Sequence, residues 1–366
     1  MKPKIVFIIN SIKQARCIRR VQEFKDEGYS TEVYAFDRSD DKRKMPDIEA
    51  RVIGLIQNGS AYLDRLRMMR NVMRELKLDQ KGGNVIYYLF SFDVSLAFLS
   101  LHPFGNHRYI YEVSDLEELK ISNLFIRKMI VFLNKKMMLG AMLNVFTSTG
   151  FKDFYRTIPD EKITVVPNRI SSLCPATGDI QRSILNINKI RIGFVGIIRY
   201  ETILHFAKVV ANDFPEIELH FYGIISRGDP YALEVEKLCE SADNLFLHGV
   251  YESPGDLPNI YDNIDFVLST YPPIPSVIYA EPNKLYEAIY FRCPIIVGKD
   301  TFLGRKVENL GIGYVIDAMD ENAIKDFLAS LNENDYQKKV VGCKKIPQKD
   351  CLNINEALFK KLDSIC

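Results

Sequence analysis

Short apolar runs that alternate with amphipathic segments most strongly constrain how this 366-residue chain folds. The runs are rich in β-branched and aromatic residues, and the segments between them have helical periodicity. This alternation is typical of parallel sheets joined by helical crossovers. The predicted strands are residues 4–10, 31–36, 50–55, 84–90, 108–114, 143–148 and 162–168, then 189–196, 217–223, 244–249, 265–270, 293–298 and 313–317.

The periodicity fades over residues 171–188, between the two sets of strands. We therefore predict an α/β fold with two Rossmann-like, doubly wound parallel-sheet domains that face each other across a cleft. The expected boundaries are 1–175 and 176–350, followed by a C-terminal helix within 351–366 that packs back on the first domain. Ligands of such sheets bind beyond the carboxyl ends of the strands.

The net charge of +1 conceals two halves of opposite sign. Residues 1–170 hold 28 basic and 20 acidic residues (+8), which leaves 48−28 = 20 basic and 47−20 = 27 acidic residues (−7) for 171–366. This asymmetry indicates domains with different partners, although drift in surface charge is an alternative. Scattered cysteines, no CxxC pair, no signal-like segment and no apolar run of about 20 residues favour a reducing cytoplasm.

Several sequence motifs of common α/β enzymes are missing. The first predicted strand leads into "INSIKQARCIRR", which has no glycine, and "GFVGIIRYE" after residue 192 lacks the third glycine of a dinucleotide fingerprint. The five histidines show no ligand-like spacing, so we expect no metal site and no cofactor.

Candidate ligand-binding residues follow the strands of the second half. Gly196 would let a ligand approach the backbone, and Arg199 suits phosphate oxygens. Gly249 and Val250 follow a later strand, and the long apolar loop 270–283 follows another. These positions share the edge at which doubly wound sheets bind ligands.

The segment "EPNKLYEAIYF" (281–291) carries the most specific pattern. Asn283 is a suitable N-cap, which predicts a helix from Lys284, and a helix N-terminus next to a lysine suits a phosphate. Glu287 lies three residues on and suits a ribose diol. Together with Arg199, these residues predict a nucleoside diphosphate site. The alternative is that Lys284 and Glu287 form an ordinary surface pair.

The second half resembles retaining nucleotide-sugar-dependent glycosyltransferases of the GT-B fold, group 1 or family 4-like, as found in capsule and lipopolysaccharide biosynthesis. The resemblance rests on five segments in the family's order: "ITVVPN" (163–168), "IGFVGIIR" (192–199), "LFLHGVY" (245–251), "IDFVLST" (264–270) and "PNKLYEAIYFRCPIIV" (282–297). In the first half, the match is mainly in layout and at "YEVSDL" (111–116).

The resemblance implies roles for individual positions. It makes Asp115, Arg199 and Lys284 the catalytic set, with Asp115 facing the cleft from the first domain. The implied nucleotide-sugar contacts are Gly196, Arg199, Gly249, Val250, Glu281, Asn283, Lys284, Leu285 and Glu287. The family's first glutamate would stand at Tyr279, and its usual arginine and lysine would stand at Ile197 and Thr202.

Two basic segments of the first half, 62–77 and 124–143, have apolar residues between their arginines and lysines. Such helices suit an anionic membrane surface, on which a lipid-linked acceptor would lie within reach. The alternative is a pair of ordinary helices, because 124–143 is apolar enough to be buried. A nucleic-acid partner is not expected, because no recognition motif is present.

The predicted activity is that of a metal-independent hexosyltransferase-like enzyme in surface polysaccharide biosynthesis. It would be cytoplasmic, or peripheral on the inner face of the membrane. The enzyme would move a sugar from a UDP- or GDP-linked donor to a saccharide acceptor, lipid-linked or free. The alternatives are a sugar-nucleotide epimerase of the same architecture and a catalytically inactive GT-B binding protein.

Overall fold

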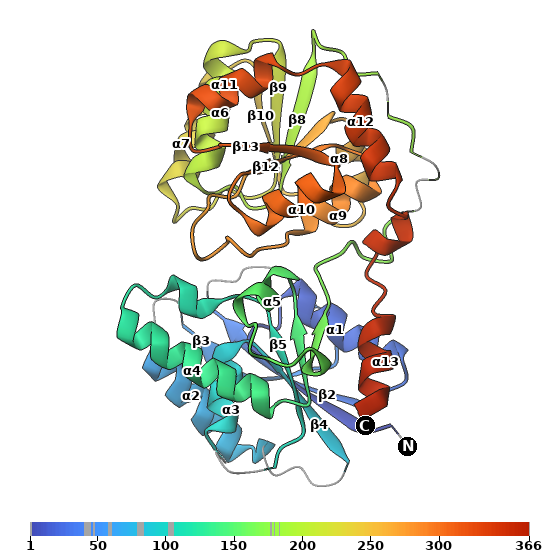
Figure 1. Cartoon of the computed structure of the whole chain (residues 1–366). Coiled ribbons are helices and arrows are strands. Elements are labelled where there is room, and N and C mark those ends of the chain that lie inside the picture. Colours follow the sequence, from blue (N-terminus) through green and yellow to red (C-terminus); the bar gives the residue numbers. More distant parts are fainter. Residues whose placement is uncertain are drawn as a thin grey trace. The chain divides into compact units, whose positions relative to one another are not determined.

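The structure, a computed structural model, describes residues 2–39, 45–46, 48–57, 61–78, 84–101, 106–175, 178, 180–182 and 184–365. The chain divides into two compact units. Unit 1 comprises Met1–Pro167 and Asn355–Cys366, and unit 2 comprises Asn168–Ile354 (Figure 1).

Unit 1 is built on a seven-stranded parallel sheet in the order β3-β2-β1-β4-β5-β6-β7. The strand order reverses between β1 and β4, the topology of a doubly wound sheet. The strands are β1 (Lys4–Ile9), β2 (Thr31–Arg38), β3 (Arg51–Ile56), β4 (Val85–Phe90), β5 (Tyr109–Val113), β6 (Leu143–Phe146) and β7 (Ile163–Val165).

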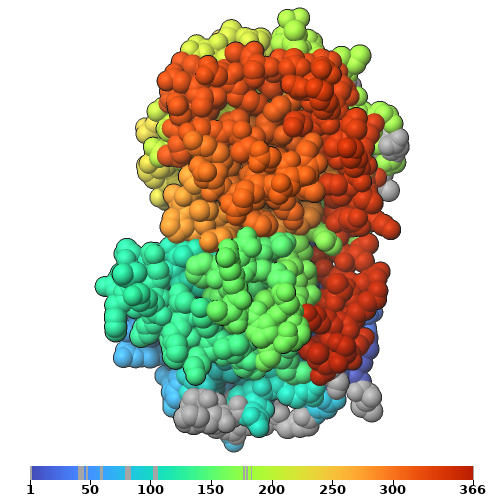
Figure 2. Space-filling view, in the orientation of Figure 1, coloured from blue at the N-terminus to red at the C-terminus, as the bar shows by residue number. Residues whose placement is uncertain are grey.

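Helices lie on both faces of this sheet (Figure 1). They are α1 (Ala15–Asp26), α2 (Tyr62–Glu75), α3 (Phe92–Leu99), α4 (Leu124–Gly140), α5 (Gly150–Phe154) and α13 (Glu356–Ile365), with 3₁₀ turns at Glu117–Lys120 and Asp160–Lys162. Leu358, Phe359 and Leu362 of α13 join the same apolar cluster as β1 and α1. Figure 2 shows this C-terminal helix in red on the surface of unit 1. The end of the chain therefore contributes to the core of unit 1.

Unit 2 holds a six-stranded parallel sheet in the order β10-β9-β8-β11-β12-β13, with the reversal between β8 and β11. Its strands are β8 (Ile190–Val195), β9 (Ile217–Tyr222), β10 (Leu245–Gly249), β11 (Phe266–Ser269), β12 (Ile295–Gly298) and β13 (Gly313–Ile316). The helices are α6 (Glu201–Asp213), α7 (Pro230–Ser241), α8 (Leu257–Asp262), α9 (Asn283–Tyr290), α10 (Phe302–Leu310), α11 (Glu321–Ala329) and α12 (Glu333–Lys344), with a 3₁₀ turn at Gln348–Cys351.

Two apolar clusters pack against opposite faces of this sheet. One gathers α6, α7 and α11 against β8 and β9, and the other gathers α8, α9 and α10 against β11 and β12. The segments that link unit 2 to unit 1 run beside each other, because Ile170 and Leu352 form a parallel bridge.

The predicted fold class is confirmed: both sheets are parallel, and each predicted strand overlaps an observed one. One local prediction is wrong. Helix α9 begins at Asn283, with Pro282 in the N-cap position and no side-chain capping bond. A proline at this position fixes an extended backbone that can lead into a helix, so no side-chain cap forms here.

Candidate functional site

The carboxyl ends of β8, β9 and β10 each reach a glycine with a left-handed backbone. These are Gly196, Gly223 and Gly249, with φ of +135°, +140° and +79°. They are hydrogen-bonded neighbours, since Gly223 N–H donates to the Gly249 carbonyl at 2.6 Å and Gly196 N–H to the Tyr222 carbonyl at 2.8 Å. Residues with side chains rarely adopt such φ values. Gly196, Gly223 and Gly249 thus form a glycine row, a stretch of backbone without side chains at the ligand-binding edge of the sheet.

Gly223 was not among the residues predicted for the site. A Cβ atom at Gly223 would lie 1.9 Å from the Gly196 carbonyl oxygen, so only glycine fits. The sequence did contain a signal, because "GFVGII" (193–198) and "HFYGII" (220–225) end in the same three residues. Their backbones bridge in parallel at Ile198 and Ile225, which explains the repeated pattern.

Lys284, in the first turn of α9, is buried with only 7% of its surface exposed. Its ammonium lies 4.4 Å from the ring centroid of Phe194 and 5.7 Å from that of Tyr271. A Cβ added to Gly196 would approach its Nζ to 3.2 Å. Lys284 makes no hydrogen bond or ion pair with any residue that the structure describes. Its charge interacts with the Glu287 carboxylate without a direct ion pair. A buried cation that makes no hydrogen bond is costly unless an anion joins it.

Arg199 lies in the same neighbourhood as Lys284. Its exposed guanidinium stacks 4.6 Å from the ring centroid of Tyr200, and that ring packs against Tyr271 at 5.8 Å. Tyr271 is the ring that Lys284 approaches. Tyr200 itself has φ of +79°, a strained backbone directly before α6. Both predicted cations therefore lie at the junction of β8 and β11, where the strand order reverses.

The N-terminus of α9 points its first N–H groups into this region without a side-chain cap. Leu285 N–H donates to the Pro282 carbonyl at 3.1 Å, whereas Asn283 and Lys284 have no such acceptor among the described residues. The Leu285 side chain is fully buried, so only its backbone can contribute to binding. Free N–H groups and the helix dipole favour an anion here.

Glu287 is 5% exposed and accepts a hydrogen bond from Tyr261 Oη at 2.8 Å. Burial raises the pKa of Glu287, and the Tyr261 hydroxyl and nearby Lys284 oppose that rise. The negative charge of Glu287 also contributes to a raised pKa of Tyr251, in the loop after β10. Glu287 and Lys284 are both buried and form no ion pair, so they are not an ordinary surface pair. The carboxylate is instead oriented by a tyrosine.

The other predicted positions differ in how accessible they are. Val250 is 78% exposed, next to Gly249, and Asn283 is exposed. Glu281 is 4% exposed and its Oε1 accepts hydrogen bonds from Tyr286 and from Lys306, the latter at 2.5 Å. This pairing fastens the loop before α9 to α10 and satisfies the carboxylate.

The resemblance places an arginine at position 197 and a lysine at position 202, and this chain has neither. Thr202 is buried and its hydroxyl donates to the Thr270 carbonyl, while Ile197 is 55% exposed. A lysine at 202 would have to displace a packed threonine. Among the described residues, the cations that adjoin the rings of Phe194, Tyr200 and Tyr271 are Lys284 and Arg199.

Unit 1 has a pocket of about 560 Å³ at its own switch point. Asn10 and Ser11 follow β1, and Ser91 and Asp93 follow β4. Asp115, the predicted cleft-facing acid, also lines this pocket and is exposed. Neither the Ser11 hydroxyl nor the Asn10 side-chain oxygen has a hydrogen-bond partner within the described part of the chain, although Ser11 is only 4% exposed.

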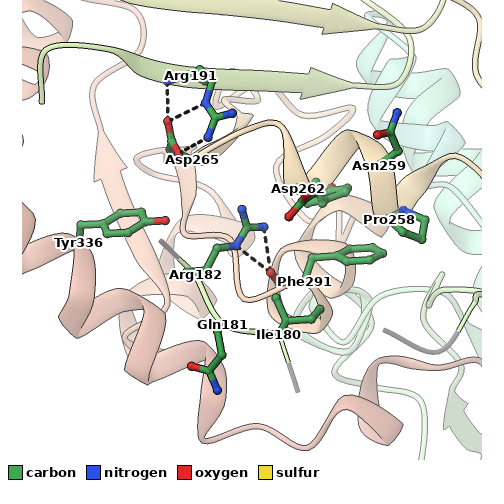
Figure 3. A pocket seen from close by; sticks show the side chains of 11 residues that line it. Ile180, Gln181, Arg182, Arg191, Pro258, Asn259, Asp262, Asp265, Phe291 and Tyr336 are labelled. Atoms are coloured by element: carbon green, nitrogen blue, oxygen red, sulfur yellow. Dashed lines mark hydrogen bonds and ion pairs between the residues drawn. The ribbon is translucent and has the colours of Figure 1, made fainter. Parts of the chain in front are cut away.

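A hollow of unit 2, shown in Figure 3, lies at the edge of the sheet opposite to the glycines, near the amino ends of β8 and β11. Arg182 fills it, with Nη1 donating to the Ile264 carbonyl at 2.7 Å and Nη2 to the Phe291 carbonyl at 2.9 Å. Beside it, Arg191 pairs with Asp265 at 3.0 Å. These arginines satisfy backbone and carboxylate groups of unit 2, so we assign this hollow a structural role.

Among the residues that the structure describes, no group of three or more histidine, cysteine, aspartate or glutamate side chains is placed to hold a metal ion. Within the same residues, no helix is long and apolar enough to cross a membrane.

No family model and no curated protein matches the chain. Among solved structures, a sucrose-phosphate synthase from Thermosynechococcus elongatus has a TM-score of 0.70 at 14% identity, over 99% of this chain and 100% of that one. The Anabaena protein HepE, in complex with UDP and glucose, has a TM-score of 0.66 at 13% identity, over 99% and 100%.

A glycosyltransferase from Rickettsia africae has a TM-score of 0.60 at 15% identity, over 100% of this chain and 98% of that one. The chain has the GT-B fold. At these identities the likeness establishes the architecture of both units, and the chemistry has to be argued from the residues of this chain.

Proposed function

We propose that this protein is a glycosyltransferase that moves a sugar from a UDP- or GDP-linked donor to a saccharide acceptor. The observation that carries the proposal is Lys284, a buried ammonium without an anionic partner among the described residues. It lies beside the uncapped start of α9 and the glycine backbone at Gly196. A diphosphate supplies the missing negative charge.

In this proposal, unit 2 binds the donor through three groups. Lys284 and Arg199 hold the diphosphate with the N–H groups of α9, and Glu287, oriented by Tyr261, accepts hydrogen bonds from the ribose hydroxyls. The base lies by Gly249 and Val250. No side chain at the glycine row obstructs the ligand.

Transfer breaks the bond between the anomeric carbon and the diphosphate oxygen, and a bond forms between that carbon and an acceptor oxygen. Negative charge grows on the departing diphosphate, where Lys284 and Arg199 stabilise it without a metal ion. As the acceptor hydroxyl bonds to the anomeric carbon, its proton passes to the departing diphosphate oxygen. Asp115, exposed in the pocket of unit 1, is the group that we assign to orient this hydroxyl.

The exposed residues of helix α4 in unit 1 favour an acceptor carried on a lipid. Phe125 is 78% exposed, Leu124 62% and Phe132 59%, and Lys128 and Lys136 on the same helix are also exposed. The expectation that this helix is buried does not hold for this face. Exposed apolar and basic residues on one helix suit an anionic membrane surface. We propose peripheral attachment there, in surface polysaccharide assembly.

Calorimetry with UDP, GDP, UDP-glucose and GDP-mannose tests the donor part. Binding of one nucleotide in the micromolar range is expected, and no binding to any would overturn the proposal. Co-sedimentation with phosphatidylglycerol vesicles, compared with phosphatidylcholine vesicles, tests α4. The Phe125→Ser, Phe132→Ser double variant should stay in the supernatant. Sedimentation equal to wild type would remove α4 from the membrane contact.

A catalytically inactive nucleotide-binding protein is the second candidate. The favouring observation is that Tyr279 stands where the family's first glutamate is expected, while nearby Glu281 is occupied by Lys306 and Tyr286. Incubation of the bound donor with saccharide acceptors distinguishes the two, because a transferase releases nucleoside diphosphate and a lengthened saccharide. An epimerase instead converts the donor to a new sugar nucleotide without an acceptor.

A further inference from the structure

One face of β9 and β10 in unit 2 is not covered by a helix along its whole length. In β9, Ile217, Leu219 and Phe221 are buried in the cluster with α6 and α7. The alternate residues, Glu218, His220 and Tyr222, are only partly buried on the opposite face. This face lines a groove of about 670 Å³, which lies outside the proposed donor residues. Its volume is in the range of small-molecule sites.

Four rings line up along this face, two from each strand. His220 Nδ1 and His248 Nε2 are 3.0 Å apart and share a hydrogen bond, with the ring planes within 17°. Because a ring N–H lies in the plane of its ring, this bond sets the imidazoles edge to edge. Tyr222 stacks on His248 at 4.3 Å and 6°, and Phe246 stacks on His220 at 4.9 Å. The face is therefore an ordered aromatic wall.

The charges around this wall are already matched. Arg191 pairs with Asp265 at 3.0 Å and Lys189 with Glu218 at 3.0 Å. Burial lowers the pKa of His220 and of His248, so both imidazoles are neutral near pH 7. A phosphate or another strongly charged ligand would have to break an existing ion pair. The charged side chains of this groove are thus paired, whereas Lys284, at the proposed donor site, forms no ion pair with a described residue.

The other wall offers neutral polar groups. Asn259, on α8, and Asn263, directly after it, are exposed and line the groove; Asn259 is also visible in Figure 3. Side-chain amides donate to and accept from hydroxyl groups, whereas aromatic rings pack against the C–H faces of a pyranose. We propose that this groove is a second saccharide site, which binds a neutral sugar chain on unit 2 apart from the donor residues.

The test uses the full-length protein with ¹⁵N-labelled histidine, whose five residues give a simple spectrum. The probes are three neutral hexasaccharides: α-1,4-linked glucose, β-1,4-linked glucose and β-1,4-linked N-acetylglucosamine. At least one is expected to shift the ring signals of His220 and His248 with millimolar affinity, while His205 on α6 stays unchanged. No shift from any of the three overturns the proposal.

Matched variants separate the groove from general effects. His248→Ala, at an exposed position of the edge strand, should weaken binding at least fivefold, as followed at His220. Leu247→Ser, the neighbouring exposed residue on the other face of β10, should leave it unchanged. Equal affinity of His248→Ala and wild type overturns the proposal, and so does competition by UDP. If the protein binds no nucleotide, the saccharide should still shift the His220 and His248 signals. One proposal can therefore fail without the other.

Discussion

Units 1 and 2 share a doubly wound parallel sheet, yet the polar groups at their switch points are satisfied in different ways. In unit 1, Arg65 pairs with Asp93 and Lys120 with Glu117, while two neutral oxygens, on Asn10 and Ser11, have no hydrogen-bond partner among the described residues. In unit 2, the hydroxyls of Ser269 and Thr270 likewise have no such partner, and the buried charge of Lys284 forms no ion pair with a described residue. Both switch points thus offer neutral polar groups, and unit 2 adds a site for an anion.

The first test of this contrast removes the charge of Lys284. Lys284→Met should weaken UDP or GDP binding at least 100-fold, about 3 kcal/mol, because the diphosphate loses its buried cation. The free protein should become no less stable, since an unpaired buried charge is removed while its apolar stem is kept. Calorimetry and urea unfolding measure the two effects.

Lys325→Met is the matched control, because Lys325 forms a surface pair with Asp213. It should change neither nucleotide affinity nor stability by more than about 0.5 kcal/mol. If Lys284→Met keeps wild-type affinity, the diphosphate does not lie at the start of α9.

The glycine row provides the second test, through stability alone. Gly223→Ala places a Cβ at 1.9 Å from the Gly196 carbonyl oxygen and should cost on the order of 3 kcal/mol of unfolding free energy. Gly249→Ala meets nothing within 4 Å, so only its left-handed backbone opposes it, by about 1 kcal/mol. Urea denaturation of both variants compares them. Similar costs for the two variants would mean that the backbone around Gly196 and Gly223 shifts easily to accept the added Cβ.

Substitution of Glu287 is the third test, because it should lower the affinity for nucleotide and raise the stability of the free protein. Glu287→Ala should weaken UDP binding by roughly 1.5–3 kcal/mol, the scale of hydrogen bonds to a charged group. Binding of 2′,3′-dideoxy-UDP should change much less, because it lacks the diol. Exposed Glu308→Ala serves as the control. Equal losses for both ligands would remove Glu287 from the ribose.

The pH dependence of stability follows from the raised pKa of Glu287. Between its ordinary value of 4.5 and the higher folded value, the folded state binds more protons than the unfolded state, so rising pH destabilises the fold. Glu287→Gln stays neutral, and it should exceed wild-type stability at pH 7 and lose that advantage below pH 4.5. Parallel unfolding curves at the two pH values check this.

The sequence predicted the strands and glycines around both sites better than the side-chain contacts within them. Strand runs and glycines at strand ends depend on local pattern, so the sheets, Gly196 and Gly249 were within reach, and α9 was placed to within one residue of its start. The aromatic cradle of Lys284 comes from Phe194 on β8 and Tyr271 after β11, which only the strand order brings together. The partner of Glu287, Tyr261, lies 26 residues earlier and has no signal of its own.

The smallest expected effect concerns Ser11 in unit 1. Its hydroxyl is buried without a partner, so Ser11→Ala breaks no hydrogen bond and should keep the free energy of unfolding within about 0.5 kcal/mol of wild type. If the hydroxyl serves an acceptor, the variant should raise KM for that acceptor about fivefold, about 1 kcal/mol, with the KM for the donor unchanged. Ser100→Ala at the end of α3 is the contrasting control, because it loses a bond to the Ala97 carbonyl without touching the pocket. A stability loss in Ser11→Ala with unchanged acceptor KM would make this serine part of the scaffold, and the contrast between the two switch points would then rest on Lys284 alone.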